Sequence, residues 1–416
     1  MKKVILYFLA FLFLLVLLGA VLFHPLITPH FGLRPMPVLE QNQSKVLDER
    51  FAGQQQQLTE TLFQSANQLE APAISVAIGV NNQLIWANAL GHANIKEGKK
   101  ASTRTQFRIG SVSKSVTSLG MGKLMEAGKL DLDTPVQEYV SYFDPGKPKI
   151  SIRQLASHTS GIRNYQPCFC FPAHEGLNND QFGSIAESIA VFGNDKLLFE
   201  PGSDFSYATY NYTLISGAME EITGMPFLDY MKSTVFQPLA MNQTMGDWAL
   251  REIKDRAVFY DVKNGKYKKA YAVNSSNKWA GGGMLSTPSD LVKMGNTLLN
   301  NTFLSPATKA TLWEPIAMNN GEINPQHYAI GWRVDATSRI LEDSKVKIIH
   351  HGGTITGSIT LIMLFPEYNM SIALMVNRTG ASGELFDPIY ELAKVLIPAI
   401  NRIQDETKEE LDTTTR

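Results

Sequence analysis

The N-terminus places the strongest constraint on how this chain can fold. After Met1-Lys2-Lys3, 20 consecutive apolar residues extend from Val4 to Phe23 without a charged residue. As a helix, this run would be about 30 Å long, which matches the hydrocarbon core of a bilayer. A cleaved secretory signal usually has only about 7–15 apolar residues before a small-x-small site. No such site stands out near Gly19-Ala20, so we predict a retained membrane anchor over residues 1–25, with a cleaved signal as the alternative.

The charges that flank this run predict its orientation. Lys2 and Lys3 are expected to remain in the cytoplasm, because positively charged ends of membrane segments stay on that side. The body is then expected on the extracytoplasmic side, in the periplasm or outside the cell, or to be secreted if the segment is cleaved. No other stretch approaches 18 apolar residues, so we predict a single membrane contact through residues 4–23.

The composition of the chain is that of a globular protein. Its 416 residues include 38 Lys and Arg against 39 Asp and Glu, which leaves a formal charge of -1. A nucleic-acid-binding protein would carry a basic surplus, so no nucleic-acid partner is predicted. Apolar residues make up 44% of the chain, which argues against disorder, and 2 cysteines are too few for a disulfide-stapled fold. The length corresponds to roughly two to three domains or to one large α/β unit.

Patterns along the chain divide it into a tether, a body and a tail. Residues 26–45 contain prolines and no periodic pattern, which is typical of a tether. Residues 401–416 are charged and rich in threonine, which predicts a solvated polar tail. The body between them, residues 46–400, contains the regular patterns of helices and strands, and we predict that it is the functional domain.

Strand patterns lie near both ends of the body, with helical patterns between them. Ala73–Val80 reads AISVAIGV and predicts a buried strand, and the turn signal Asn81-Asn82 links it to Gln83–Leu90 in a hairpin. A helix is predicted from Ser111 to about Gly128. Further strands are predicted at 329–334, 358–365 and 371–376, and a helix near 384–396. This order predicts one sheet built from both ends of the body, with a helical insertion.

The segment Phe107–Lys114 contains a Ser-x-x-Lys pattern formed by Ser111 and Lys114. On a helix, residues three apart share a face, so the amine of Lys114 can reach the hydroxyl of Ser111. A serine hydroxyl becomes a nucleophile when a nearby base removes its proton. A lysine can be that base when burial or neighbouring cations lower its pKa. The same spacing is common in helices, so alone it is a weak signal.

Three further segments carry groups that suit the same chemistry. Tyr207 lies in Phe205–Tyr212, and a tyrosine beside an ammonium group can shuttle protons, although an aromatic loop packed on the core is the alternative. His351 and Gly353 lie in HHGGTITG, where glycines allow close approach of the backbone to a ligand and free an N–H for an oxyanion. A plain turn with a hydrogen-bonded histidine is the alternative there. Ser157–Gly161 (SHTSG) is also consistent with a helix end and its polar caps.

The two cysteines, Cys168 and Cys170, are separated by one residue. In extended backbone, residues i and i+2 point the same way, so a small-ring disulfide and two free thiols both stay open. A zinc site would need a second ligand pair at suitable spacing, and the sequence has none. The sequence also lacks a Gly-x-Ser-x-Gly elbow and glycine-rich phosphate or dinucleotide motifs. No metal and no cofactor are predicted.

Taken in order, the motifs resemble those of the serine beta-lactamase-related family, which includes class C beta-lactamases, D,D-peptidases and family VIII esterases. The resemblance covers about residues 50–400. The motifs that carry it are FRIGSVSK, GKLDLDTP, SHTSG, PGSDFSY, GGGMLST and HGG. Six independent matches in one order are rare by chance, so together the motifs are specific.

The resemblance implies an α+β fold of the beta-lactamase/transpeptidase type. An antiparallel sheet flanked by helices would face a mostly helical lobe, with the active site between them. Ser111 resembles the acylated nucleophile and Lys114 its activating partner. Tyr207 resembles the tyrosine that moves the proton to the leaving group and activates water. The backbone N–H groups of Ser111 and Thr354 would form the oxyanion hole.

Two departures from the family pattern affect the substrate. His351 and Gly353 match the Lys-Thr-Gly element, with histidine in the lysine position, and a largely neutral histidine is a weaker anchor for a carboxylate. Thr209 stands where the family often has the asparagine of Tyr-x-Asn, and its hydroxyl lacks the paired donor and acceptor of an amide. We predict that His351, Gly353 and Thr209 bind substrate. Asn211 replaces the missing amide only if the loop bulges.

The sequence therefore predicts a membrane-anchored, exported serine hydrolase that forms an acyl-enzyme. Its substrate would be an amide, peptide or ester, either a small molecule or a peptide. A true beta-lactamase or D-Ala-D-Ala carboxypeptidase is the alternative within this chemistry. A non-catalytic, membrane-tethered binding or scaffold protein on the same fold is the alternative of a different class, because fold alone does not guarantee activity. The oligomeric state stays open.

Overall fold

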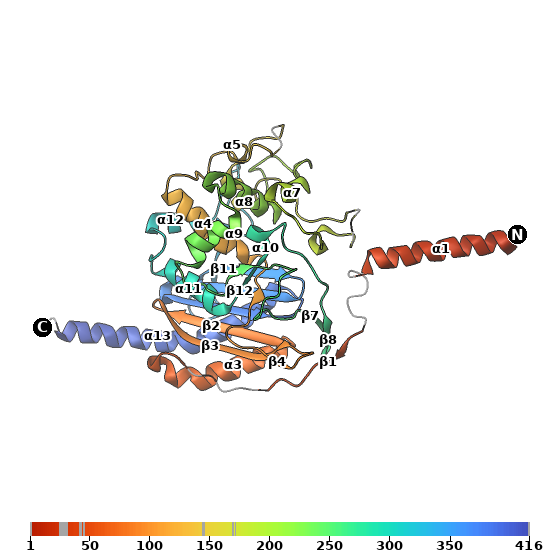
Figure 1. Ribbon diagram of the computed structural model, residues 1–416. Coiled ribbons are helices and arrows are strands. Elements are labelled where there is room, and N and C mark those ends of the chain that lie inside the picture. The colour runs from red at the N-terminus through yellow and green to blue at the C-terminus, as the bar shows by residue number, and fades with distance from the viewer. Residues whose placement is uncertain are drawn as a thin grey trace.

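A long apolar helix projects from a body in which helices cover both faces of a central sheet, as the computed structural model shows (Figure 1). The structure describes residues 2–24, 32–40, 44, 46–143, 146–168, 170 and 172–414, with the backbone alone from 407 to 414. The projecting helix is α1 (Lys2–Leu22), which has a mean hydropathy of 3.0 and is not buried against the body. Among the described residues it is the one helix that is long and apolar enough to cross a membrane.

The centre of the body is a 7-stranded sheet in which every pair of neighbours is antiparallel. In spatial order its strands are β10 (Arg333–Thr337), β11 (Val346–Ile355), β12 (Ser358–Phe365), β13 (Met370–Val376), β2 (Ala73–Val80), β3 (Gln83–Asn94) and β4 (Lys99–Lys100). The middle pair, β13 and β2, joins the two ends of the body, because Ile372 lies opposite Ile78. The predicted α+β architecture, with a sheet built from both ends, is therefore confirmed.

Helices cover both faces of this sheet. They are α3 (Gln55–Gln68), α11 (Pro288–Leu299) and α13 (Phe386–Thr414). The larger side chains of β2, such as Ile74 and Val76, pack with α3 and α13 in one core. Small residues alternate with them and face α11: a Cβ added to Gly79 would lie 2.7 Å from Val292. Burial on both faces explains why the central strands are almost uniformly apolar.

A helical lobe is inserted between β5 and β10 in the sequence and lies beside the sheet (Figure 1). At its base α4 (Val112–Glu126) is buried on nearly all sides and contacts both β11 and α10. The other helices of this region are α5 (Val136–Tyr139), α6 (Ile152–Ala156), α7 (Ile185–Ala190), α8 (Tyr210–Thr223), α9 (Phe227–Met231), α10 (Trp279–Gly282) and α12 (Pro306–Leu312). Short helical turns are η1 (Glu49–Gln54), η2 (Glu175–Leu177), η3 (Lys232–Phe236), η4 (Pro366–Tyr368) and η5 (Ser382–Leu385).

Two small antiparallel sheets complete the body. One contains β5 (Phe107–Arg108), β9 (Met284–Ser286) and β6 (Met245–Gly246), and it leads the chain into α4. The other contains β1 (Arg34–Pro35), β8 (Lys266–Lys269) and β7 (Tyr260–Lys263). Because β1 belongs to the segment predicted as a tether, that segment is fixed to the body at this point.

The strand predictions hold best where the sequence is continuously apolar. The predicted strands at 73–80 and 358–365 match β2 and β12. The strand predicted at 329–334 begins later, as β10, because Gly331 turns the chain with a φ of 78°. The sequence did not predict β11, whose histidines and glycines we expected to precede a strand. In the structure, these residues form part of the strand itself.

The helix predicted near 384–396 is α13, which continues through the polar segment to Thr414 with Pro398 inside it.

Cys168 and Cys170 are joined in a disulfide, which is one of the two states that the sequence left open.

We expect the pairing of β13 with β2 to dominate the stability of the sheet. Leu374 of β13 is fully buried opposite Val76, so Leu374→Ala should lower the free energy of unfolding by about 2–5 kcal/mol, because it leaves a cavity in a packed core. Urea denaturation of the purified protein measures this loss. Leu250→Ala is the matched control, since Leu250 is 83% exposed and its truncation should change stability by less than about 0.5 kcal/mol. Equal losses for the two variants would contradict the described core.

Candidate active site

The turn that enters α4 brings Ser111 and Lys114 together. Gly110 adopts a φ of 49°, which a side chain would disfavour, and Ser111 follows as the residue that caps α4. Lys114 lies one helical turn further on, and its Nζ is 3.2 Å from the Oγ of Ser111. The contact that the Ser-x-x-Lys spacing suggests is thus present in the structure.

Lys114 is completely buried, with three hydrogen-bonding oxygens around its amine, of which the Ser111 hydroxyl can donate to a neutral Nζ. Besides Ser111, the Nζ donates to the carbonyl oxygen of Gly281 at 2.6 Å and to the Oγ1 of Thr209 at 3.3 Å. No carboxylate pairs with it in the described part of the chain. Burial, followed by the charges of Arg333 and Lys278, therefore holds the pKa of Lys114 well below its ordinary value. A neutral amine in this position can accept a proton.

Tyr207 stands on the other side of Ser111. Its hydroxyl is hydrogen-bonded to Ser111, and its ring lies 4.8 Å from the Nζ of Lys114. Burial raises the pKa of Tyr207 to about 12, while the bond to Ser111 and the charge of Arg333 oppose that rise. Tyr207 therefore keeps its proton at neutral pH and joins Ser111 and Lys114 in a continuous set of exchangeable protons.

Strand β11 passes against the turn before α4. A Cβ added to Gly353 would lie 1.9 Å from the carbonyl oxygen of Ile109 and 3.3 Å from the backbone nitrogen of Ser111. A Cβ added to Gly110 would lie 2.9 Å from the backbone nitrogen of Thr354. The two backbones are thus in direct contact, and only glycine fits at position 353. The peptide groups of Ser111 and Thr354, predicted to form the oxyanion hole, lie side by side.

His351, predicted to bind substrate, is fully buried with both ring nitrogens already bonded. Its Nδ1 is 2.7 Å from the carbonyl oxygen of Gly352, which can only accept, so Nδ1 carries the proton. Its Nε2 therefore accepts from the hydroxyl of Tyr328 at 2.7 Å. Burial and the charges of Arg333 and Lys114 keep the pKa of His351 well below its ordinary value. In this structure His351 is a neutral group that fixes β11 to Tyr328.

Thr209 also lies in the interior, with an exposure of 5%. Its hydroxyl accepts from Lys114, and its backbone N–H donates to the Oδ1 of Asn164 at 3.1 Å. Asn211 does not take the place of the missing amide, because it is buried in α8 and accepts from Ser160. The side-chain amide that bonds to Thr209 is that of Asn164, which sequence reasoning did not single out.

The segment Ser157–Gly161 places Tyr207 rather than taking part in the contacts of Ser111. His158 is buried, and its ring centroid is 4.1 Å from that of Tyr207 and 4.6 Å from that of Tyr328. Its Nδ1 accepts from the backbone N–H of Ala208 at 3.2 Å. The histidine therefore holds the segment next to Tyr207 by both packing and a hydrogen bond.

Arg333 is a second group that the sequence did not reveal. It begins β10, and its guanidinium lies 5.5 Å from the ring centroid of Tyr207 and 5.0 Å from that of Tyr328. No carboxylate pairs with it among the described residues, and its side-chain partner there is the amide oxygen of Gln326. An arginine has no local pattern that would mark it, because its place beside Tyr207 depends on how β10 joins the sheet.

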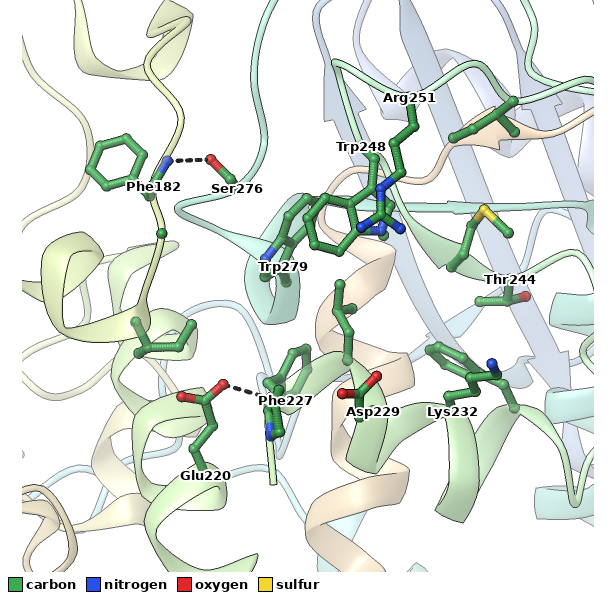
Figure 2. A pocket seen from close by; sticks show the side chains of 18 of the residues that line it. Phe182, Glu220, Phe227, Asp229, Lys232, Thr244, Trp248, Arg251, Ser276 and Trp279 are labelled. Carbon is green, nitrogen blue, oxygen red and sulfur yellow. Dashed lines mark hydrogen bonds between the residues drawn. The ribbon is translucent and has the colours of Figure 1, made fainter. Parts of the chain in front are cut away.

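A separate cavity of about 900 Å³ lies next to the site and shares α10 with it (Figure 2). In the wall of this cavity, Trp248 and Trp279 lie next to each other with ring centroids 4.9 Å apart, and Arg251 lies over Trp248 (Figure 2). Ser111, Lys114 and Tyr207 do not line this cavity.

Among the described residues, no group of three or more His, Cys, Asp and Glu side chains is arranged to hold a metal ion.

A family model described as Beta-lactamase matches residues 54–396. The chain belongs to the beta-lactamase family. The resemblance predicted from the motifs is thus confirmed, and this family of serine hydrolases supports hydrolase activity.

Relatives of this beta-lactamase family protein span most of its length. It is 30% identical over 389 residues to the human serine beta-lactamase-like protein LACTB, mitochondrial, covering 74% of this chain and 71% of the relative. It is 25% identical over 338 residues to penicillin-binding protein 4* of Bacillus subtilis, covering 77% and 71%. The D-amino acid amidase from Ochrobactrum anthropi, solved with L-phenylalanine amide, shares the fold with a TM-score of 0.68, 21% identity and coverage of 83% and 98%.

The buried amine should be visible in the pH dependence of stability. Between the lowered pKa of Lys114 and the value of 10.5 in the unfolded chain, the unfolded state binds a proton that the folded state excludes. The free energy of unfolding should therefore rise with pH up to about 10.5. Lys114→Met removes this contribution, so the wild type should gain stability relative to the variant between pH 7 and 10, as measured by urea unfolding. The exposed Lys129 gives the control variant Lys129→Met, whose curve should stay parallel to the wild type.

Proposed function

We propose that this protein is a membrane-anchored, exported serine hydrolase that forms an acyl-enzyme at Ser111. The observation that carries the proposal is the buried amine of Lys114, 3.2 Å from the Oγ of Ser111 and without a carboxylate partner in the described residues. A lowered pKa favours the neutral amine, which can accept a proton, and a serine beside such a base is a nucleophile. The substrate class is an amide, a peptide or an ester.

In acylation, the Nζ of Lys114 accepts the proton of Ser111 while the Oγ forms a bond to the acyl carbon. The carbonyl oxygen of the substrate becomes an oxyanion, which the backbone N–H groups of Ser111 and Thr354 stabilise. The contact between Gly353 and Ile109 supports this role, because it holds the two peptide groups together. One donor of this kind typically contributes a factor of about 10²–10³ to kcat.

Collapse of the tetrahedral intermediate breaks the bond to the leaving nitrogen or oxygen. That atom takes the proton from the set formed by Lys114, Ser111 and Tyr207, with the phenol of Tyr207 as the donor nearest to Ser111. In deacylation a water molecule gives a proton back to this set, its oxygen bonds to the acyl carbon, and the bond to the Oγ breaks. The raised pKa of Tyr207, about 12, suits a group that passes protons without remaining ionised.

Arg333 refines the substrate class. The sequence led us to expect weak carboxylate binding, because His351 occupies the lysine position. Arg333 has no carboxylate partner in the described residues and lies over the ring of Tyr207, so it supplies the positive charge that His351 lacks. A guanidinium binds a carboxylate through paired hydrogen bonds. We therefore favour peptides or amides that carry a free carboxylate close to the scissile bond, as in a carboxypeptidase reaction.

The N-terminal helix supports the location part of the proposal. α1 is 21 residues long, its side chains do not pack on the body, and Lys2 precedes the apolar run. Exposing such a surface to water is costly at about 25 cal/mol per Å² of apolar area. A bilayer removes that cost, with the body on the side opposite to Lys2.

We expect Ser111→Ala to abolish hydrolysis without unfolding the protein. The rate of p-nitrophenyl butyrate hydrolysis should fall by at least about 10³-fold, because the nucleophile and its base act as one unit. Intact-mass measurement after reaction with a fluorophosphonate should show one adduct on the wild type and none on the variant.

Ser113→Ala is the matched control, since Ser113 lies in the same motif and its Oγ accepts from the backbone N–H of Met284. This variant should keep the adduct. An unlabelled wild type with a native fold would favour the non-catalytic scaffold instead.

Arg333→Gln should separate recognition of a carboxylate from the chemistry. For an acyl-D-Ala-D-Ala peptide with a free terminal carboxylate, kcat/KM should fall by about 10–100-fold, because a charged hydrogen bond is lost. For the same peptide with an amidated terminus, the change should be less than threefold.

Arg339→Gln is the control, since Arg339 is an exposed arginine that pairs with Asp387 away from Tyr207. It should leave both substrates unaffected. Equal losses on the two peptides with Arg333→Gln would contradict carboxylate binding by Arg333.

A further inference from the structure

A basic hairpin lies where the tether joins the body. Strands β7 and β8 form this hairpin, residues 260–269, with Asn264 and Gly265 at its turn. The tether strand β1 adds to its edge, with Arg34 opposite Tyr267 and a backbone bond from Met36 to Gly265. Figure 1 shows β1, β7 and β8 together at the end of the body from which the chain leads to α1. The tether thus joins the hairpin directly to the proposed anchor, whose last residue, Leu22, also accepts from the backbone N–H of Ala173 in the body at 3.1 Å.

Four of the five charged side chains of the hairpin share one of its faces. Residues directly opposite each other in an antiparallel pair point to the same side. The pairs Lys263 with Lys266 and Asp261 with Lys268 therefore share a face, which carries three lysines and one aspartate. Tyr260, Tyr267 and Lys269 lie on the other face, where the two tyrosine ring centroids are 5.4 Å apart.

Two of these lysines, Lys263 and Lys266, repel each other. Lys263 and Lys266 are exposed and directly opposite each other across the hairpin, an arrangement that like charges disfavour. No carboxylate pairs with either one in the described residues, whereas the nearby Lys100 pairs with Glu40. The exposed Arg34 on β1 adds another positive charge beside them. The carboxylate of Glu70 accepts from the backbone N–H of Gly265 at the turn and offsets part of this repulsion, and an external anion would offset the rest.

The tether keeps the hairpin near any membrane that holds α1. From Leu22 to Arg34 the chain advances by 12 residues, and such a segment spans at most about 40 Å even when fully extended. Confinement within this distance gives the hairpin a high effective concentration at the surface. A few lysines then suffice, because each basic residue close to an anionic leaflet strengthens binding by about fivefold.

We propose that the basic hairpin binds the phosphate headgroups of anionic lipids in the membrane that holds α1. This inference rests on the membrane anchor of the proposed function and is independent of the reaction at Ser111. Binding at Lys263 and Lys266 adds a second attachment to the one through α1, so the body takes a fixed orientation on the membrane. Protein partners with acidic surfaces are the competing occupants, and pure lipid discs exclude them.

The full-length chain in lipid nanodiscs provides the test. Discs of phosphatidylcholine alone are compared with discs that contain phosphatidylglycerol, and lysines are acetylated with acetic anhydride, an uncharged reagent. Mass spectrometry then gives the acetylation rate at each lysine. Lys263 and Lys266 should react at least threefold more slowly in the anionic discs, and 0.5 M NaCl should restore their rates, because salt screens the attraction. Lys129 and Lys196, exposed on the helical lobe, should react equally in both discs.

A charge-matched pair of variants completes the design. Lys268 lies on the same face and should also react more slowly in the anionic discs; in Lys263→Gln/Lys266→Gln this protection should be lost, whereas Lys129→Gln/Lys196→Gln should keep it. Equal rates at Lys263 and Lys266 in both discs, or protection that spreads equally to Lys129, would overturn the proposal. A chain that does not co-elute with discs would overturn it together with the anchor. Hydrolysis of p-nitrophenyl butyrate should be the same in all variants, so a failure of the proposed chemistry is recognised separately.

Discussion

The site depends on one amine that is buried with acceptors around it and without a counter-charge among the described residues. The Nζ of Lys114 reaches Ser111, Thr209 and Gly281, which belong to α4, to the segment before α8 and to α10. Three distant parts of the chain must therefore pack correctly before this amine is surrounded. A protonated Lys114 would have no carboxylate to balance it and would also face the charges of Arg333 and Lys278. Burial thus lowers the pKa of Lys114 and favours its neutral form.

The two parts of the body contribute different groups to the site. The sheet contributes backbone: β11 lies so close to the turn before α4 that a side chain at Gly353 would overlap Ile109. The helical region contributes side chains, among them Ser111, Lys114 and Tyr207. His158 and His351 link the two parts in the interior, because both rings pack against Tyr328. Each histidine is buried, and burial lowers its pKa and favours the neutral ring. These two buried histidines therefore fix the segments that surround Ser111, Lys114 and Tyr207.

Sequence reasoning succeeded where the signal was local. Continuous apolar runs predicted β2 and β12, because a strand covered on both faces needs no polar residues. The spacing of Ser111 and Lys114 predicted their contact, because one helical turn fixes it. β11 was not predicted, because its glycines and histidines are required by the contact with the turn before α4 and are not typical of strands.

Groups brought in from far along the chain could not be predicted from their own surroundings. Arg333 reaches Tyr207 only because β10 adds to the edge of the sheet. Asn164 meets Thr209 across 45 residues, and the carbonyl of Gly281 meets Lys114 across 167. The roles of Tyr207 and Thr354 came from the family resemblance, and without it their segments are ordinary loops and strands.

The order in which the sheet can close has a consequence for how such a chain is made. β2 pairs with β13, so Ile74 meets Val376 near the other end of the chain. A ribosome must therefore release almost the whole polypeptide before the central pair forms, and until then the early strands have no partner on that side. A translocation pore threads only unfolded chain. For the exported, membrane-anchored protein that we propose, late closure would keep the polypeptide threadable until the body has crossed the bilayer.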